Sequence, residues 1–145
     1  MRNKLVFIYA LVLALCFGGY AVYTQRALKA AQTFYLIMEP SDPFSLMSGE
    51  YMQINYAFES AIWTEEPFPK EVTLYIDGQG VANYPKTGQP LVFKIRGLRT
   101  RLPHQFYFKE GTAGRYESAF YAQIKRLPDG RYLLSGLADK NLKLL

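Results

Sequence analysis

The sequence has 145 residues, half of them hydrophobic and 20% charged, which excludes wholesale disorder and suits one folded domain with an additional segment. A single Cys and a single His exclude an intrachain disulfide and a Cys/His zinc site within one chain. The net charge of +5 comes mainly from bases around an apolar N-terminal segment, and the rest of the chain is nearly neutral. The positive net charge therefore does not indicate nucleic-acid binding. The flanking bases are Arg2, Lys4, Arg26 and Lys29.

Residues 5–23 read LVFIYALVLALCFGGYAVY and carry no charge. A helix of this length covers about 28 Å at 1.5 Å per residue, close to the thickness of a bilayer's hydrocarbon core. Three tyrosines near its ends suit the headgroup region. The long apolar stretch and the bases Arg26 and Lys29 after it favour a retained membrane anchor over a cleaved signal peptide. A buried soluble helix would show a polar stripe, which this segment lacks.

We expect two units in the chain: a membrane anchor with a helical extension over residues 1–32, and an extracytoplasmic domain over residues 33–145. Arg2, Lys4 and the amino terminus precede the apolar segment, whereas Arg26 and Lys29 follow it. This slight asymmetry predicts a cytoplasmic N-terminus. The protein is then a single-pass membrane protein whose C-terminal domain lies outside the cytoplasm.

Beyond the anchor, short segments of alternating apolar residues separated by turn signals predict roughly seven strands and no long amphipathic helix. Asp77-Gly78 and residues 127–130 (LPDG) are typical hairpin turns. The fold class we expect is mainly β, a curled antiparallel sheet or a small β-barrel-like domain. The expected strands lie within residues 34–38, 51–58, 72–76, 81–84, 91–96, 105–108, 116–126 and 132–134, and one helical turn lies within residues 59–69.

Residues 49–56 read G-E-Y-M-Q-I-N-Y, and this string resembles the consensus that names the GDYXXLXY-domain family. Gly49, Tyr51 and Tyr56 match, Glu50 replaces the Asp of the family, and Ile54 replaces its Leu.

The segments at residues 39–43, 106–111 and 116–117 also look like the family's, so the resemblance spans nearly all of residues 33–145. It implies a bacterial envelope protein with a periplasmic domain on a short N-terminal anchor. It also implies a multi-pass membrane protein as a neighbour, and no established activity.

The alternation within the motif places Met52, Ile54 and Tyr56 on one apolar face. Tyr51 is out of phase, so either it faces away or a β-bulge realigns it. A buried tyrosine needs an acceptor for its hydroxyl, and acids elsewhere in the family-like segments are candidates. The motif then serves either to fix the entry of a strand or to build a ligand or partner site. The candidate residues are Gly49, Glu50, Tyr51, Ile54, Tyr56, Glu110 and Glu117.

A basic run stands near the middle of the chain and consists of Lys94, Arg96, Arg99 and Arg101. It is interpreted as a solvated strand-and-loop edge, or as a contact for an acidic partner or lipid headgroups. Aromatic interleaving of an RNA-binding type is missing from it.

A weaker resemblance connects Lys94 and the serines upstream, Ser45 and Ser48, with type I signal peptidases, which use a Ser–Lys pair. However, the Ser-Met-x-Pro motif of those enzymes is missing, and Lys94 alternates onto the polar side of its strand. His104 stands alone beside Pro103, and we expect a surface or satisfied histidine. No spacing indicates a metal site.

The sequence thus predicts a non-enzymatic, membrane-anchored envelope domain without a cofactor. It would act as an accessory or partner-binding subunit of a multi-pass membrane protein, with the lipid bilayer and that protein as its partners and no nucleic acid. One alternative is a degenerate signal-peptidase-like Ser–Lys hydrolase. Another is a small-ligand-binding β domain with Glu110 or Glu117 at the rim of an apolar pocket.

Overall fold

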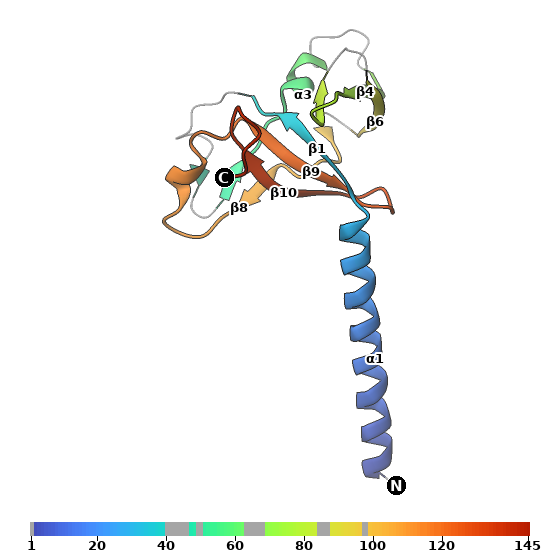
Figure 1. Ribbon diagram of the computed structural model, residues 1–145. Helices are drawn as coiled ribbons and strands as arrows, with labels where there is room; N and C mark the ends of the chain where they lie inside the picture. The colour runs from blue at the N-terminus through green and yellow to red at the C-terminus, as the bar shows by residue number, and fades with distance from the viewer. Residues whose placement is uncertain (1, 40–46, 49–50, 63–68, 84–87, 97–98) are drawn as a thin grey trace.

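A computed structural model describes residues 2–39, 47–48, 51–62, 69–83, 88–96 and 99–145. Its first element is a single long helix, α1 (Arg2–Lys29), which stands out from a β-rich domain (Figure 1). Within Val6–Lys29, the most apolar 18-residue window has a mean hydropathy of 2.1, and none of this window is buried. Among the described residues, α1 is the one helix that is long and apolar enough to cross a membrane.

Most of the domain is one curled sheet of seven strands, with a small three-stranded sheet beside it. The larger sheet has the order β10-β9-β1-β5-β4-β6-β7 and the smaller has the order β2-β3-β8. The larger sheet consists of β1 (Gln32–Ile37), β4 (Glu71–Ile76), β5 (Val81–Asn83), β6 (Gln89–Arg96), β7 (Arg99–Thr100), β9 (Tyr121–Arg126) and β10 (Tyr132–Ala138). The smaller consists of β2 (Met47–Ser48), β3 (Tyr51–Gln53) and β8 (Gln105–Tyr107). The described residues also form the short helix α3 (Ala57–Ile62) and a 3-10 turn, η1 (Ala113–Tyr116).

The mainly β fold class and the curled sheet are confirmed, but the sheet is mixed rather than wholly antiparallel. Strands β1 and β5 pair in parallel, with Tyr35 opposite Val81, whereas the other strand pairs are antiparallel. A parallel pair needs a long crossover. The chain supplies it, because β2, β3, α3 and β4 all intervene between β1 and β5.

The core lies between the inner faces of the two sheets. Alternate residues of the interior strand β1, Phe34 and Leu36, are fully buried. They share one core cluster with Leu74, Phe93 and Ile124 from other strands of the sheet. The rings of Phe34 and Phe93 meet edge to face with centroids 6.3 Å apart. Each such side chain contributes about 1.5–3 kcal/mol through its removal from water, so the period-2 pattern of the sequence sets the inward face.

The segment after the motif departs from the predicted strand over residues 51–58. Strand β3 ends at Gln53, and α3 begins at Ala57, earlier than the helical turn predicted within residues 59–69. Phe58 still enters the core, because a helix brings Phe58 and Ile62, four residues apart, onto one buried face. A strand and a helix thus satisfy the same apolar pattern over these few residues.

The two predicted hairpins are confirmed, and their turns share one geometry. In the β4–β5 turn, Gly80 N donates to Asp77 O and Asp77 N to Val81 O; in the β9–β10 turn, residues 127–131 repeat this pattern. The fourth residue in each turn is a glycine with positive φ, +83° at Gly80 and +82° at Gly130, which only glycine adopts without strain.

Candidate functional site

The motif strand β3 pairs with β8, and this pair separates its side chains between two faces. The register sets Tyr51 opposite Tyr107, Met52 opposite Phe106, and Gln53 opposite Gln105. Met52 and Phe106 face inward: Met52 is buried, and Phe106 is packed against the core. The side chains of the other four residues therefore lie on the outer face, and Tyr51 faces away from the core without a bulge.

The outer face of β3 and β8 presents aromatic rings and amides to solvent. The rings of Tyr51 and Tyr107 lie with centroids 5.8 Å apart, and Tyr107 is 68% exposed. The Tyr107 hydroxyl donates a hydrogen bond to Gln105 Oε1 at 2.9 Å. This face can contact a ligand through ring surfaces and can both donate and accept hydrogen bonds.

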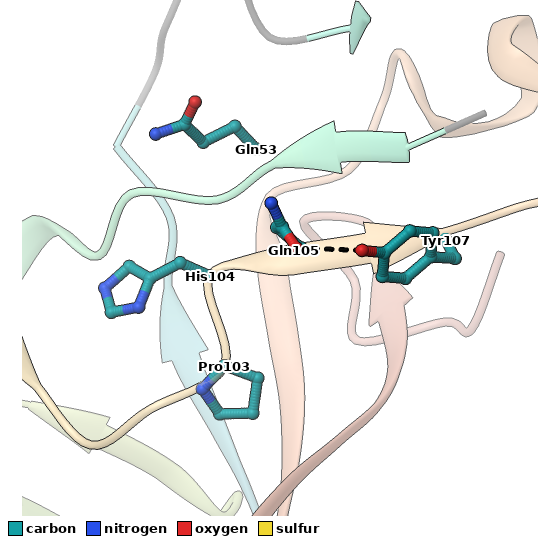
Figure 2. Close-up of a pocket in the computed structure, with 5 residues that line it drawn as sticks. All are labelled: Gln53, Pro103, His104, Gln105 and Tyr107. Carbon is teal, nitrogen blue, oxygen red and sulfur yellow. Dashed lines mark hydrogen bonds between the residues drawn. The ribbon is translucent and has the colours of Figure 1, made fainter. Parts of the chain in front are cut away.

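An open groove of about 480 Å³ adjoins this face (Figure 2). Gln53 comes from β3, whereas the other lining residues come from β8 and the segment just before it. We call this surface the tyrosine groove. Its described lining residues are Gln53, Pro103, His104, Gln105 and Tyr107.

Tyr56, the last residue of the motif, is fully buried behind the groove. Its hydroxyl donates a hydrogen bond to the carbonyl oxygen of Pro103, and its ring meets His104 edge to face with centroids 5.3 Å apart. Burial, reinforced by the negative charge of Glu59, raises the pKa of Tyr56 well above its ordinary value. The phenol therefore remains a hydrogen-bond donor and ties the motif to the segment that precedes β8.

A buried carboxylate, Glu59 on α3, binds the same segment from the other side. Its Oε1 accepts hydrogen bonds from the backbone N of Thr100, at 2.9 Å, and from Thr100 Oγ1. Its Oε2 lies 2.9 Å from His104 Nε2, and the two side chains are 9% and 12% exposed. Burial opposes the charge, but hydrogen bonds from His104 and Thr100 outweigh it and hold the pKa of Glu59 below its ordinary value.

This arrangement differs from a hydrolytic triad. In a triad the imidazole lies next to the nucleophilic hydroxyl and accepts its proton. Here the carboxylate of Glu59 lies between them, so the Thr100 hydroxyl and His104 Nε2 both donate to Glu59. His104 is therefore the satisfied histidine that the sequence predicted, and the three residues form a structural latch. We call Glu59, Thr100 and His104 the Glu59 latch.

The structure separates the residues proposed from the motif. Ile54 and Tyr56 belong to the core, and Tyr51 belongs to the outer face. Glu110 and Glu117 are exposed, and within the described ranges neither carboxylate makes a hydrogen bond or ion pair. Neither acid lines the tyrosine groove. Gly49 and Glu50 lie outside the described residues.

The basic run follows the hairpin that β6 forms with β7, the last strand of the larger sheet, where Arg96 and Arg99 are opposite each other. Lys94 is 81% exposed and lies 4.0 Å from Glu71, and Arg101 is also exposed. The Lys94 amine is in water rather than in the apolar setting that activates the lysine of a Ser–Lys pair. Ser45 lies outside the described residues, and so does the side chain of Ser48.

The sequence interpretation missed Glu59 and Thr100, and it did not propose the residues of the tyrosine groove as a site. Glu59 had one usable signal, because it is an acid within the apolar segment AFESAI, at helical spacing to buried neighbours. Nothing local indicated its partner His104, which lies 45 residues further on. Among the described residues, no group of three or more His, Cys, Asp or Glu side chains is placed to hold a metal ion.

Comparisons with curated proteins and with solved structures give no match. The family model described as GDYXXLXY protein matches residues 13–137, a range that includes most of α1, the motif strand, α3 and the segments that line the groove. The resemblance read from residues 49–56 is thereby confirmed, and the chain belongs to the GDYXXLXY protein family.

Proposed function

We propose that this chain is a non-enzymatic, membrane-anchored envelope domain that binds a segment of a multi-pass membrane protein. The observation that carries the proposal is the uncovered apolar surface of α1. Four consecutive residues, Val6 to Tyr9, are 56–74% exposed, so apolar side chains face outward in every direction around the helix. Each large apolar side chain left in water forgoes about 1.5–3 kcal/mol, and a bilayer is the environment that covers all sides of such a helix.

The proposed topology has the N-terminus in the cytoplasm and the β domain on the outer side of the membrane. Arg2 and Lys4 precede the apolar stretch, and Arg26 and Lys29 follow it. The chain enters β1 three residues after α1 ends, so the domain begins directly at the membrane surface. A short connection of this kind keeps the domain within reach of the extracytoplasmic loops of a neighbouring membrane protein.

The tyrosine groove is the surface that we assign to the partner. Tyrosine is enriched in protein interfaces, and an open groove suits an extended peptide segment better than a small molecule, which needs an enclosing pocket. Gln53 and Gln105 offer amide donors and acceptors to a peptide backbone. The partner side chains expected there are uncharged, because His104 is bonded internally to Glu59 and the described lining residues include no Lys, Arg, Asp or Glu.

The two alternative functions receive less support. The hydrolase needs a desolvated Lys94, and this side chain is exposed. The small-ligand binder needs Glu110 or Glu117 at a pocket rim, and neither acid is among the described residues that line the tyrosine groove or the hollow beside α3.

Membrane fractionation tests the anchor. The full-length chain should remain in the membrane pellet after alkaline carbonate washing and should enter the soluble phase only with detergent. Recovery of the intact, full-length chain in the soluble fraction would overturn the proposal.

Site-specific photo-crosslinking in membranes tests the partner. A photoreactive phenylalanine analogue in place of Tyr107 should capture a multi-pass membrane protein. The matched control is the same analogue at Leu133, which is exposed on β10, remote in sequence from the groove strands. Equal capture from both positions, or capture from neither, would remove the groove as the partner site.

A further inference from the structure

The turn between β9 and β10 lies beside the C-terminal end of α1, although the two are about 100 residues apart in sequence. Gln32, the first residue of β1, pairs with Arg126, the last residue of β9. Because these strands are antiparallel, the residues after Arg126 continue back toward the helix that precedes Gln32. Figure 1 shows the tip of this hairpin next to the domain end of α1.

The same end of the molecule carries exposed bases from both elements. Arg26 and Lys29 are in the last turn of α1, and Arg126 and Arg131 flank the hairpin turn; all four are exposed. The one acid in the hairpin turn, Asp129, binds Arg131 Nε at 2.8 Å. The bases therefore outnumber the acids where the helix enters the domain.

The C-terminal third of α1 also carries two tyrosines, Tyr20 and Tyr23. Tyrosines prefer the headgroup level of a bilayer. The β9–β10 turn lies beside the end of the same helix, so it is near the depth where lipid phosphates lie.

Among the described residues, another turn at this end of the sheet joins β4 and β5 and brings one more acid, Asp77. Its carboxylate accepts hydrogen bonds from the backbone N of Gln79 and Val81, both at 2.9 Å. Since this carboxylate is engaged within its own turn, it leaves the four bases available to an anionic surface.

We propose that the β9–β10 turn rests on the bilayer and that Arg126 and Arg131, with Arg26 and Lys29, bind the phosphate groups of anionic phospholipids. The inference rests on the proposed membrane anchor and adds a second point of attachment to it. Two attachments restrict rotation of the domain about the axis of α1, so they fix which face of the domain a neighbouring membrane protein meets.

Spin-label accessibility in lipid nanodiscs tests this contact with the full-length chain, in a Cys16→Ser background. A nitroxide attached through Pro128→Cys reports the turn, one through Phe17→Cys reports the helix, and one through Lys140→Cys reports the solvated surface. In discs of phosphatidylcholine with phosphatidylglycerol, the turn label should collide with an aqueous nickel relaxant severalfold less often than the Lys140 label. In discs of phosphatidylcholine alone, or at high salt, this protection should decrease.

A pair of double variants provides the matched control. Arg126→Gln with Arg131→Gln should remove the protection of the turn label, whereas Lys94→Gln with Arg101→Gln removes the same charge from the β6–β7 hairpin and should leave it intact. A turn label as accessible as the Lys140 label, with the Phe17 label buried in lipid, overturns this inference and leaves the anchor standing. An accessible Phe17 label overturns both. Protection that is equal in both lipid compositions overturns the role of anionic headgroups.

Discussion

Tyr51 and Tyr56 belong to one motif yet lie in opposite environments. Tyr56 is fully buried, and its hydroxyl is bonded to the Pro103 carbonyl, whereas the ring of Tyr51 lies on the outer face beside the exposed Tyr107. On the inner side of this region, which includes the Glu59 latch, each buried side-chain nitrogen and oxygen atom of the described residues has a hydrogen-bond partner. The outer side has ring surfaces and amides that remain open to solvent. The motif therefore has two roles. Tyr56 binds the segment that lines the groove from its buried side, and Tyr51 contributes a ring to the outer face.

The largest expected effect is on the inner side, at Glu59. Glu59→Ala leaves Thr100 and His104 as buried donors without an acceptor, and breaking a buried charged pair typically costs about 3–5 kcal/mol. Denaturant unfolding of the full-length chain in detergent, followed by near-ultraviolet circular dichroism, measures the loss. The control is Glu117→Ala at an exposed acid, with a change within about 0.5 kcal/mol. Equal losses from the two variants would show that the Glu59 latch does not stabilise the fold.

A smaller loss is expected from Tyr56→Phe, which keeps the ring and removes only its hydroxyl. The variant leaves the Pro103 carbonyl without its donor, and an unpaired buried polar group costs about 1–3 kcal/mol. The matched outer-face variant Tyr107→Phe removes a hydroxyl bonded to an exposed amide and should change the free energy of unfolding by less than about 0.5 kcal/mol. Equal losses in the free energy of unfolding from Tyr56→Phe and Tyr107→Phe would show that the buried hydroxyl stabilises the fold no more than the exposed one.

Low pH should lower the free energy of unfolding by protonating Glu59. Its pKa in the folded protein lies below the ordinary value of 4.5, so the charged carboxylate contributes stability that is fully present above that value. This contribution is lost as the pH falls through the lower, folded-state pKa. Unfolding measured between neutral and acidic pH should therefore show a decline that is shallower in Glu59→Gln. An identical decline in both proteins would assign the acid sensitivity to other groups.

A small effect on stability, together with a large effect on partner binding, is expected from removing the Tyr107 ring on the outer side. Tyr107→Ala removes a cross-strand aromatic pair worth about 0.2–1 kcal/mol and takes away the most exposed ring of the tyrosine groove. Co-purification from membranes under mild detergent should lose the partner, while the unfolding curve changes little. Retention of the partner by this well-folded variant would show that the partner binds a surface other than the tyrosine groove.

Several features were predictable because their physical causes are local. Residues 5–23 are apolar without interruption, and Asp77-Gly78 and residues 127–130 (LPDG) have the turn chemistry that closes the two observed hairpins. Alternation correctly assigned Met52, Ile54 and Tyr56 to the core. It also placed Phe58 in the core correctly, but it assigned this residue to a strand and not to α3, because a buried residue at that position fits a strand and a helix equally well.

The sequence by itself determined the apolar helix, the family, the hairpin turns and the inward face of the strands, since each follows from periodicity or composition over a few neighbouring residues. Only the tertiary structure decided that β1 and β5 run in parallel, that Glu59 meets His104, and that Arg126 and Arg131 lie beside the end of α1. These facts depend on contacts between residues that are roughly 45 to 100 positions apart in the chain. Such contacts are set by how the whole sheet curls and packs, and no local pattern records that geometry.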